Sequence, residues 1–195
     1  MNIGIIVDGQ AEYHSLRKLY DKALSPHTLL KPIYADIQPL APTSQIVGVI
    51  KRKLPILRNM NASKILVLID RETRDICPGE WATQIRNALD ANCTHPGTQD
   101  FAVVVKNTCY ENWLISDTSI FRKMPKRFSL RAAQLRSVEP DKADRVDAQA
   151  ILKAAAIRDA YDKVADSICI LNLADPTRMA QNSRSFRRFL RELSS

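Results

Sequence analysis

The chain has 195 residues, of which 45% are hydrophobic and 26% are charged, an ordinary composition for a globular protein with one buried core. Its apolar runs fall short of the ~20 residues that span a bilayer, and it starts on a strand-like segment, so we expect a cytoplasmic protein with no membrane association. The formal net charge of +8 comes from two basic segments, 121–138 and 178–195, which suit either a polyanionic partner or ordinary solvated helix faces.

The first 60 residues alternate between strand and helix patterns. The apolar run Ile3–Val7 predicts a strand, and Glu12–Leu24, which is apolar on one face, predicts a helix. Leu29–Ile37 is typical of a second strand, and a proline near its start favours an edge position in the sheet. Ser44–Met60 predicts a further helix that Pro55 kinks or ends early.

Two strongly apolar runs follow. Lys64–Ile69 and Phe101–Lys106 have the composition of parallel strands covered on both faces. Glu80–Ala91 predicts the helix between them, and Tyr110–Ser116 predicts a short helix after the second run. The alternation indicates a Rossmann-like α/β fold, in which helices cover both faces of a central, mostly parallel sheet.

The last third of the chain changes character. Residues 118–145 are basic and irregular, 146–165 predict a helix, and 167–173 predict a strand or a helix segment. We therefore expect an α/β core over residues 1–120 and a basic, mainly helical extension over 121–195, packed together as one compact domain.

Carboxylates follow three of the predicted strands. The carboxyl ends of parallel strands meet at one edge of a sheet, so we expect these side chains to share a crevice. Asp8 and Glu12 flank a glycine turn after the first strand. Asp70 and Glu72 lie two residues apart in extended chain and should share a face, and Glu111 follows the last predicted strand.

Clustered carboxylates either take up protons or share a cation. Their hard oxygen atoms suit Mg²⁺ (or Mn²⁺), and such an ion can activate water in phosphoryl transfer. Each residue alone also has an ordinary structural role. Asp8 can cap a helix, Glu12 suits a first helical turn, and Asp70 or Glu72 can pair with a neighbouring arginine.

Five segments carry a family resemblance. They are Asp8-Gly9-Gln10-Ala11-Glu12, Leu68-Ile69-Asp70-Arg71-Glu72, Tyr110-Glu111-Asn112-Trp113-Leu114-Ile115-Ser116-Asp117, Tyr161-Asp162-Lys163 and Ser183-Arg184-Ser185-Phe186-Arg187-Arg188-Phe189-Leu190. In this order and spacing, over nearly the whole chain, they resemble the TOPRIM-like proteins grouped as domain of unknown function 4276, relatives of the OLD-type nucleases.

The resemblance implies a compact TOPRIM fold, a divalent metal at the acidic crevice, and frequent association with bacterial defence loci, often beside an ATPase. Two positions depart from the TOPRIM pattern: Asp8 stands where Glu is usual, and Asp70-Arg71-Glu72 replaces Asp-x-Asp. Both changes keep the charge and move the carboxylate by about one methylene group, which matters because magnesium constrains ligand geometry tightly. Glu12, one helical turn away, can compensate for the shorter Asp8.

Basic residues of two segments are candidates for nucleic-acid contact. Residues 183–193 predict a basic amphipathic helix whose arginines recur at three- and four-residue spacing and so share a face. Such a stripe suits a phosphate backbone or an acidic protein partner. Lys106, at a strand end, is a candidate phosphate contact that could steady developing charge. The nucleic-acid candidates are Arg122, Lys123, Lys126, Arg127, Arg184, Arg187, Arg188 and Arg191.

Two hypotheses of different classes follow. The first is a Mg²⁺-dependent nuclease or related phosphotransferase acting on DNA or RNA in bacterial anti-phage defence. In it, Asp8, Glu12, Asp70 and Glu72 hold the metal, and Glu12, Asp70 and Glu111 act in catalysis. The second is a catalytically inactive TOPRIM-like subunit that binds nucleic acid or regulates a partner ATPase. The sequence leaves the oligomeric state open.

Overall fold

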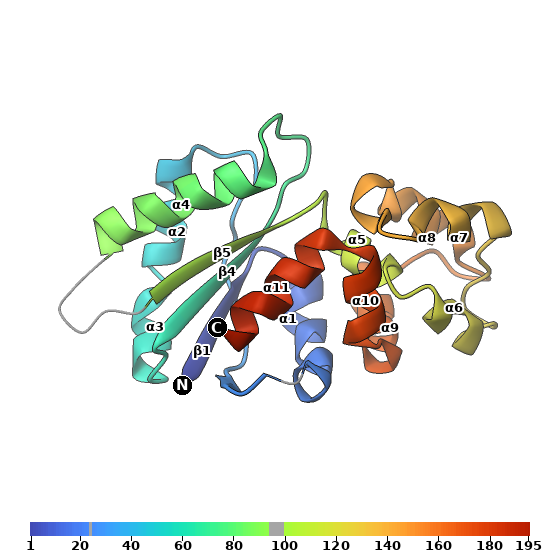
Figure 1. Ribbon diagram of the computed structural model, residues 1–195, viewed down its shortest axis with the longest axis horizontal. Coiled ribbons are helices and arrows are strands. Elements are labelled where there is room, and N and C mark those ends of the chain that lie inside the picture. The colour runs from blue at the N-terminus through green and yellow to red at the C-terminus, as the bar shows by residue number, and fades with distance from the viewer. Residues whose placement is uncertain (24, 94–99) are drawn as a thin grey trace.

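A parallel β-sheet forms the centre of the computed structural model, which describes residues 1–23, 25–93 and 100–195. The strand order is β2-β1-β4-β5, and a further short strand, β3, also pairs with β1; every pairing is parallel (Figure 1). The predicted α/β class with a central parallel sheet is therefore confirmed. The strands are β1 (Asn2–Val7), β2 (Thr28–Leu29), β3 (Ile33–Tyr34), β4 (Lys64–Asp70) and β5 (Asp100–Lys106).

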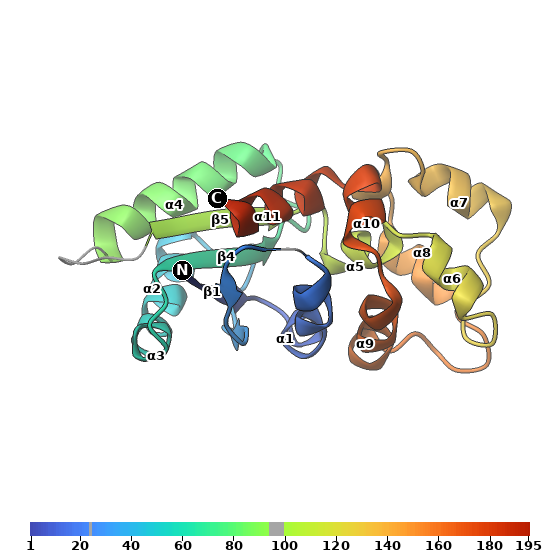
Figure 2. The same ribbon diagram turned by 60° about the horizontal axis from the view of Figure 1, so that its bottom comes forward.

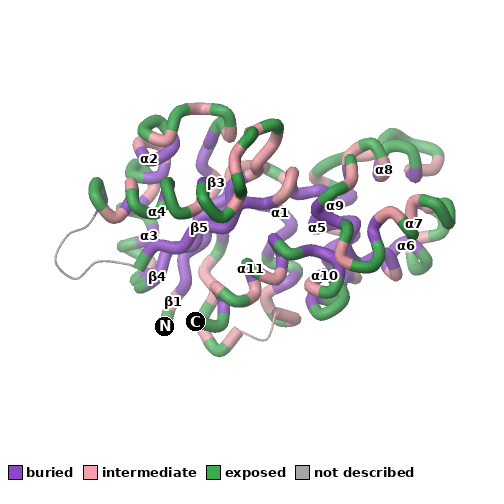
Figure 3. Tube along the Cα trace, turned by 45° about the horizontal axis from the view of Figure 1, so that its top comes forward, coloured by how far each residue is buried: buried purple, intermediate pink, exposed green. Residues whose placement is uncertain are grey.

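One face of the sheet is covered by α2 (Thr43–Lys51), α3 (Leu54–Asn59) and α4 (Pro78–Cys93). In α4 the buried residues recur every fourth position, which gives the helix a narrow apolar stripe toward the strands; they are Trp81, Ile85, Leu89 and Cys93. Alternate strand residues point into this layer, and the three long strands are buried along nearly their whole length (Figure 3).

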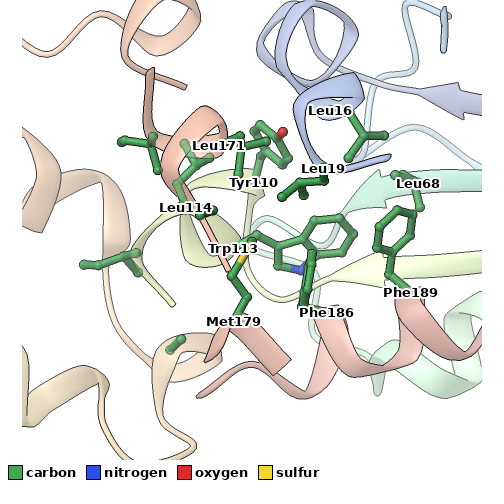
Figure 4. Close-up of a cluster of buried hydrophobic side chains, with 14 of the residues drawn as sticks. Leu16, Leu19, Leu68, Tyr110, Trp113, Leu114, Leu171, Met179, Phe186 and Phe189 are labelled. Carbon is green, nitrogen blue, oxygen red and sulfur yellow. The ribbon is translucent and has the colours of Figure 1, made fainter. Parts of the chain in front are cut away.

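The other face of the sheet carries a second core built from segments far apart in the sequence. Trp113 is its centre: its ring lies 5.2 Å from that of Phe186 and 5.1 Å from that of Phe189 (Figure 4). Its indole N–H donates to Ser185 Oγ at 2.8 Å, so the one buried polar atom of the ring is satisfied. The elements of this layer are α1 (Gln10–Ser15), the 3₁₀ helix η1 (Leu16–Lys22), α5 (Tyr110–Ile115), α9 (Lys163–Leu173) and α11 (Arg184–Ser194).

The rest of the C-terminal region is helical, and α11 returns from it to pack against β5 (Figure 2). Its other helices are α6 (Ser119–Lys123), α7 (Ala132–Val138), the 3₁₀ helix η2 (Ala143–Arg145), α8 (Ala148–Ala155) and α10 (Pro176–Asn182). Among the described residues, no helix has the length and hydropathy needed to cross a membrane.

Prolines explain two differences from the predicted elements. The predicted strand Leu29–Ile37 consists of two short strands on either side of Pro32, both on the outer edge of β1, because proline cannot donate to a sheet. The predicted helix Ser44–Met60 is divided into α2 and α3, with Pro55 in the first turn of α3, a position that tolerates the missing N–H.

Two further differences from the predicted elements concern the ends of helices. The predicted helix Glu12–Leu24 becomes α1 followed by η1, and Leu24 lies outside the described residues. The predicted helix 146–165 ends at Ala155, and a new helix begins after Asp162, whose side chain accepts from the N–H groups of Val164 and Ala165. Residues 167–173 are therefore helical, as part of α9.

Candidate functional site

The carboxyl ends of three adjacent strands deliver charged side chains to one point. Asp8 follows β1, Asp70 ends β4, and Lys106 ends β5 directly beside Asp70 in the strand register. Glu12 joins them from the first turn of α1. Carboxylate oxygens of Asp8, Glu12 and Asp70 all lie within 4.8 Å of one another. We call Asp8, Glu12 and Asp70, together with Lys106, the acidic cluster.

Lys106 occupies the centre of the acidic cluster. Its ammonium donates to Asp8 Oδ1 at 2.6 Å and to Glu12 Oε1, and it lies 3.0 Å from Asp70 Oδ1. The lysine side chain is 0% exposed. It was a candidate phosphate contact, and here it is the internal counter-ion of three carboxylates.

Asp8 and Gly9 fix the geometry around the lysine. Asp8 Oδ2 accepts the backbone N–H of Asp70 at 2.6 Å, so one carboxylate ties the ends of β1 and β4 together. A Cβ on Gly9 would overlap the carboxylate of Glu12. The glycine is extended rather than left-handed, so it is required here for space and not for an unusual φ.

Burial disfavours the ionised carboxylates of the acidic cluster. It raises the pKa of Glu12 and, together with the charges of Asp8 and Glu12, it raises the pKa of Asp70 well above the usual value; Lys106 opposes both shifts. Burial alone would lower the pKa of Lys106, but the three carboxylates raise it well above its usual value. Three carboxylates around one ammonium leave two negative charges, which only protons or a further cation can balance.

The donor set fits a divalent cation. Mg²⁺ binds oxygen at ~2.0–2.1 Å in octahedral geometry, which places neighbouring ligand oxygens about 2.9 Å apart and opposite ones about 4.1 Å apart. Carboxylate oxygens of the three residues lie within 4.8 Å of one another, somewhat wider than this octahedral spacing. Asp70 Oδ1 is buried and, within the described chain, has an ion-pair contact with Lys106 at 3.0 Å as its interaction and no assigned hydrogen bond. Asp70 therefore keeps its capacity to bind a cation.

Glu72 is not part of the acidic cluster. Its backbone is left-handed, with φ 52°, and its N–H donates to the carbonyl of Thr108 at 2.9 Å. The chain turns at this point, so the expectation that Glu72 shares a face with Asp70 is wrong. Glu72 instead lines a neighbouring cavity of about 620 Å³, together with Arg71 and Gln149.

Glu111 has its own partners. Its Oε1 lies 3.2 Å from Lys163 Nζ, and its Oε2 accepts from Gln149 Nε2 at 3.5 Å. Burial would lower the pKa of Lys163, but the charges of Glu111 and Asp70 raise it. Lys163 is therefore the charged partner of Glu111.

Asn112 anchors the turn that presents Glu111. Its side-chain oxygen accepts the N–H groups of Thr108 and Cys109, and its amide donates to the carbonyls of Ala143 and Val146. Both ends of the amide are satisfied, so α5 is held at its first turn. This rigid support is what a precisely placed carboxylate requires.

The basic candidates before α11 divide into exposed residues and one structural residue. Arg122, Lys123 and Lys126 are exposed around the end of α6. Arg127 instead donates to Asp166 Oδ1 at 2.8 Å and to Oδ2 at 2.5 Å, and also to three backbone carbonyls of the segment 157–160. It holds that segment onto α9.

The four candidate arginines of α11 differ in exposure. Arg187 is half-buried and donates to Asp141 Oδ1 at 2.7 Å. Arg184, Arg188 and Arg191 are exposed, and they line a second cavity of about 620 Å³ between α11 and α4.

The sequence reasoning missed two side chains of the site and the position of a third. Lys163 and Gln149 hold Glu111. Lys163 belongs to one of the five resemblance segments but had no predicted role, and no local spacing signals either contact, because the two residues come from separate helices. The central position of Lys106 did have a signal. A lysine that ends an otherwise apolar strand, beside two strands that end in carboxylates, is placed to pair with them.

A family model described as "Domain of unknown function (DUF4276)" matches residues 7–194 of the chain. No curated protein and no solved structure matches the chain.

Proposed function

The chain belongs to the DUF4276 family, and we propose that its acidic cluster binds Mg²⁺ or Mn²⁺ for phosphate chemistry on DNA or RNA. The observation that carries this proposal is the convergence of Asp8, Glu12 and Asp70, with ligand oxygens within 4.8 Å at the carboxyl edge of a parallel sheet. This edge is where open α/β sheets bind their ligands.

Each residue of the acidic cluster has a distinct part in the proposed site. Lys106 holds Asp8 and Glu12 in fixed positions before any ligand binds, so less rearrangement is needed later. Asp70, which accepts no hydrogen bond from the described residues, is the most available ligand. Glu72 lines the adjacent cavity, where it can contact substrate or a second ion.

A bound divalent ion would supply activated water and would stabilise the leaving oxygen of a phosphodiester. Glu111 is the candidate for proton transfer, because its carboxylate faces Lys163 and lies beside the same cavity wall as Gln149. The exposed Arg122, Lys123 and Lys126 supply positive charge for a phosphate backbone. The TOPRIM relationship and a role in anti-phage defence belong to this proposal through the family resemblance.

Lys106 also supports a second candidate function. Its ammonium already occupies the meeting point of the three carboxylates, as it would in a domain that keeps the cluster for stability alone. In that case the chain is a binding or regulatory subunit, with the basic surfaces docking nucleic acid or a partner such as an ATPase.

Calorimetry with Mg²⁺ and Mn²⁺, followed by cleavage assays on labelled DNA and RNA, separates the two functions. For the enzyme we expect Mg²⁺ binding by the native chain, with at least about tenfold weaker binding and loss of cleavage in Asp70→Asn. This substitution also removes one buried negative charge, so folding should be preserved.

The matched control is Glu80→Gln, which changes an exposed carboxylate on α4 in the same way. It should leave metal binding and cleavage unchanged. Cleavage that persists in EDTA, or that survives Asp70→Asn, would refute the proposed site. Absence of metal binding by a folded native chain would favour the regulatory subunit.

A further inference from the structure

Strand β5 has one free edge. It ends the strand order, and β4 is its only partner strand among the described residues. The N–H of Asp100 donates to Ser63, and the carbonyl of Lys106 accepts from Arg71, so even-numbered residues direct their backbone groups toward β4. Because this direction alternates along a strand, Phe101, Val103 and Val105 direct theirs toward the free edge.

The free edge opens into the 620 Å³ cavity between α4 and α11, which flank β5 on its two sides (Figures 1 and 2). We call this cavity the edge groove. Its floor is apolar, and its walls are two helices, so a chain entering it would lie as the next strand of the sheet. A long apolar edge strand is normally blunted or covered, because it pairs readily with other chains.

The spacing of arginines along α11 is close to the spacing of alternate side chains in an extended chain. Lys64, at the start of β4, donates to the carbonyl of Glu192 and to Ser195 Oγ, so α11 runs antiparallel to β5. Arg184 and Arg188 are separated by about 6 Å along the helix axis. Alternate residues of an extended strand are about 6.6–6.8 Å apart, so every second side chain of a guest strand would meet an arginine.

The charge of the edge groove favours an acidic guest. The acidic residues on its wall already have partners: Asp100 pairs with Arg86, Asp141 with Arg184 and Arg187, Glu192 with Arg188 and Lys64, and Asp144 accepts hydrogen bonds from Ser183 and Ser185. Within the described chain, the side chains of Arg145 and Arg191 have no such partner, and both are exposed. Two guanidiniums therefore remain available.

We propose that β5 binds an extended acidic segment of a partner protein as an added strand, with backbone hydrogen bonds to Phe101, Val103 and Val105. Acidic side chains at alternate positions would meet Arg145 and the arginines of α11, and apolar side chains between them would face α4. Main-chain pairing would supply affinity, and the arginines would supply specificity. This inference is independent of metal chemistry at the acidic cluster.

Two other occupants fit less well. A second copy of the chain would bring its own available arginines against these, which repels. A single-stranded nucleic acid gains most from aromatic stacking. Of the described residues, Phe101 is the one aromatic side chain that lines the groove, and it is 1% exposed.

The probe is a fluorescein-labelled peptide, acetyl-Val-Glu-Val-Glu-Val-Glu-amide, measured by fluorescence anisotropy in EDTA. We expect saturable binding, and roughly tenfold weaker binding or none for the same peptide with Lys in place of Glu. Two further peptides carry N-methyl groups on every Val or on every Glu. Only alternate amides of an added strand face β5, so one of these two peptides should bind and the other should not.

The variant is the double substitution Arg145→Glu and Arg191→Glu, which should weaken the acidic peptide at least about tenfold and favour the Lys peptide. Arg52→Glu, an exposed arginine at the end of α2 and outside the groove, is the control, and unfolding curves check that each variant folds. The proposal is overturned if the acidic peptide does not bind, if both N-methylated peptides bind, or if the double variant binds it normally. Displacement of the peptide by oligo(dT) would reassign the groove to nucleic acid, and a groove-dependent dimer in sedimentation would reassign it to a second copy.

Discussion

Replacing Lys106 by Met tests whether one ammonium holds the acidic cluster together. The side chain is fully buried and contacts all three carboxylates. Removing one member of such a buried ionic group costs ~3–5 kcal/mol, out of a total stability of ~5–15 kcal/mol for a domain. For a chain of this length, that corresponds to a fall in Tm of roughly 6–20 °C.

The expected deficit depends on pH, because protons can replace the missing ammonium. Burial raises the pKa values of Glu12 and Asp70, so at acidic pH these carboxylates take up protons and their repulsion is relieved; Lys106→Met should then lie closer to the native stability. At pH 8 the deficit should be largest, and Mg²⁺ should recover part of it. Urea unfolding at pH 5 and pH 8, with and without Mg²⁺, measures these differences.

The control for this experiment is Lys153→Met, an exposed lysine on α8 that should unfold like the native chain at both pH values. Equal stability of Lys106→Met and the native chain at pH 8 would refute the role of the lysine as counter-ion. A deficit of the same size at both pH values would instead assign the loss to packing.

Three further predictions concern the same cluster. Gly9→Ala should cost ~1–3 kcal/mol in urea unfolding, because the added methyl group overlaps the Glu12 carboxylate; native-like stability would show that Glu12 moves freely. In the native chain, the raised pKa values of Glu12 and Asp70 mean that the folded state binds more protons, so the free energy of unfolding should fall as pH rises from about 4 through those values; a rise over that range would contradict the shifts. The contribution of Lys106 to the free energy of unfolding should persist until the pH exceeds about 10.5, because the carboxylates raise its pKa in the folded state. Mg²⁺ binding should displace protons from Glu12 and Asp70, whose pKa values burial raises, so its calorimetric heat should vary with the ionisation enthalpy of the buffer; identical heats in phosphate-free buffers of different enthalpy would exclude proton displacement.

The fold was predictable where local patterns agreed with the tertiary structure. Lys64–Ile69 and Phe101–Lys106 are apolar in a way that a sheet covered on both faces explains, and both strands are buried, with β4 inside the sheet and β5 at its edge. Boundaries within the helices were less predictable. A cap such as Asp162 divides a continuous helical pattern, because the local hydrogen bonds to Val164 and Ala165 outweigh the propensity of the flanking residues.

The sequence allowed us to predict which strand ends form the candidate site, but not the position of every side chain in it. Asp8, Glu12 and Asp70 converge as the parallel topology requires. Glu72 could not be placed in the same way, because the side-chain alternation of a strand stops where the backbone turns left-handed. The partners of Glu111 come from α8 and α9, and their approach depends on the packing of the whole C-terminal region.

The charge balance of the acidic cluster allows Lys106 and a divalent cation to be present in it together. Lys106 hydrogen-bonds to Asp8 and Glu12 and forms an ion pair with Asp70 at 3.0 Å. The two negative charges that remain equal the charge of one Mg²⁺. A domain that kept these carboxylates for stability alone would gain from a second internal cation, and within the described residues Lys106 is the only basic side chain in contact with them. This imbalance supports the proposed metal site over the second candidate function.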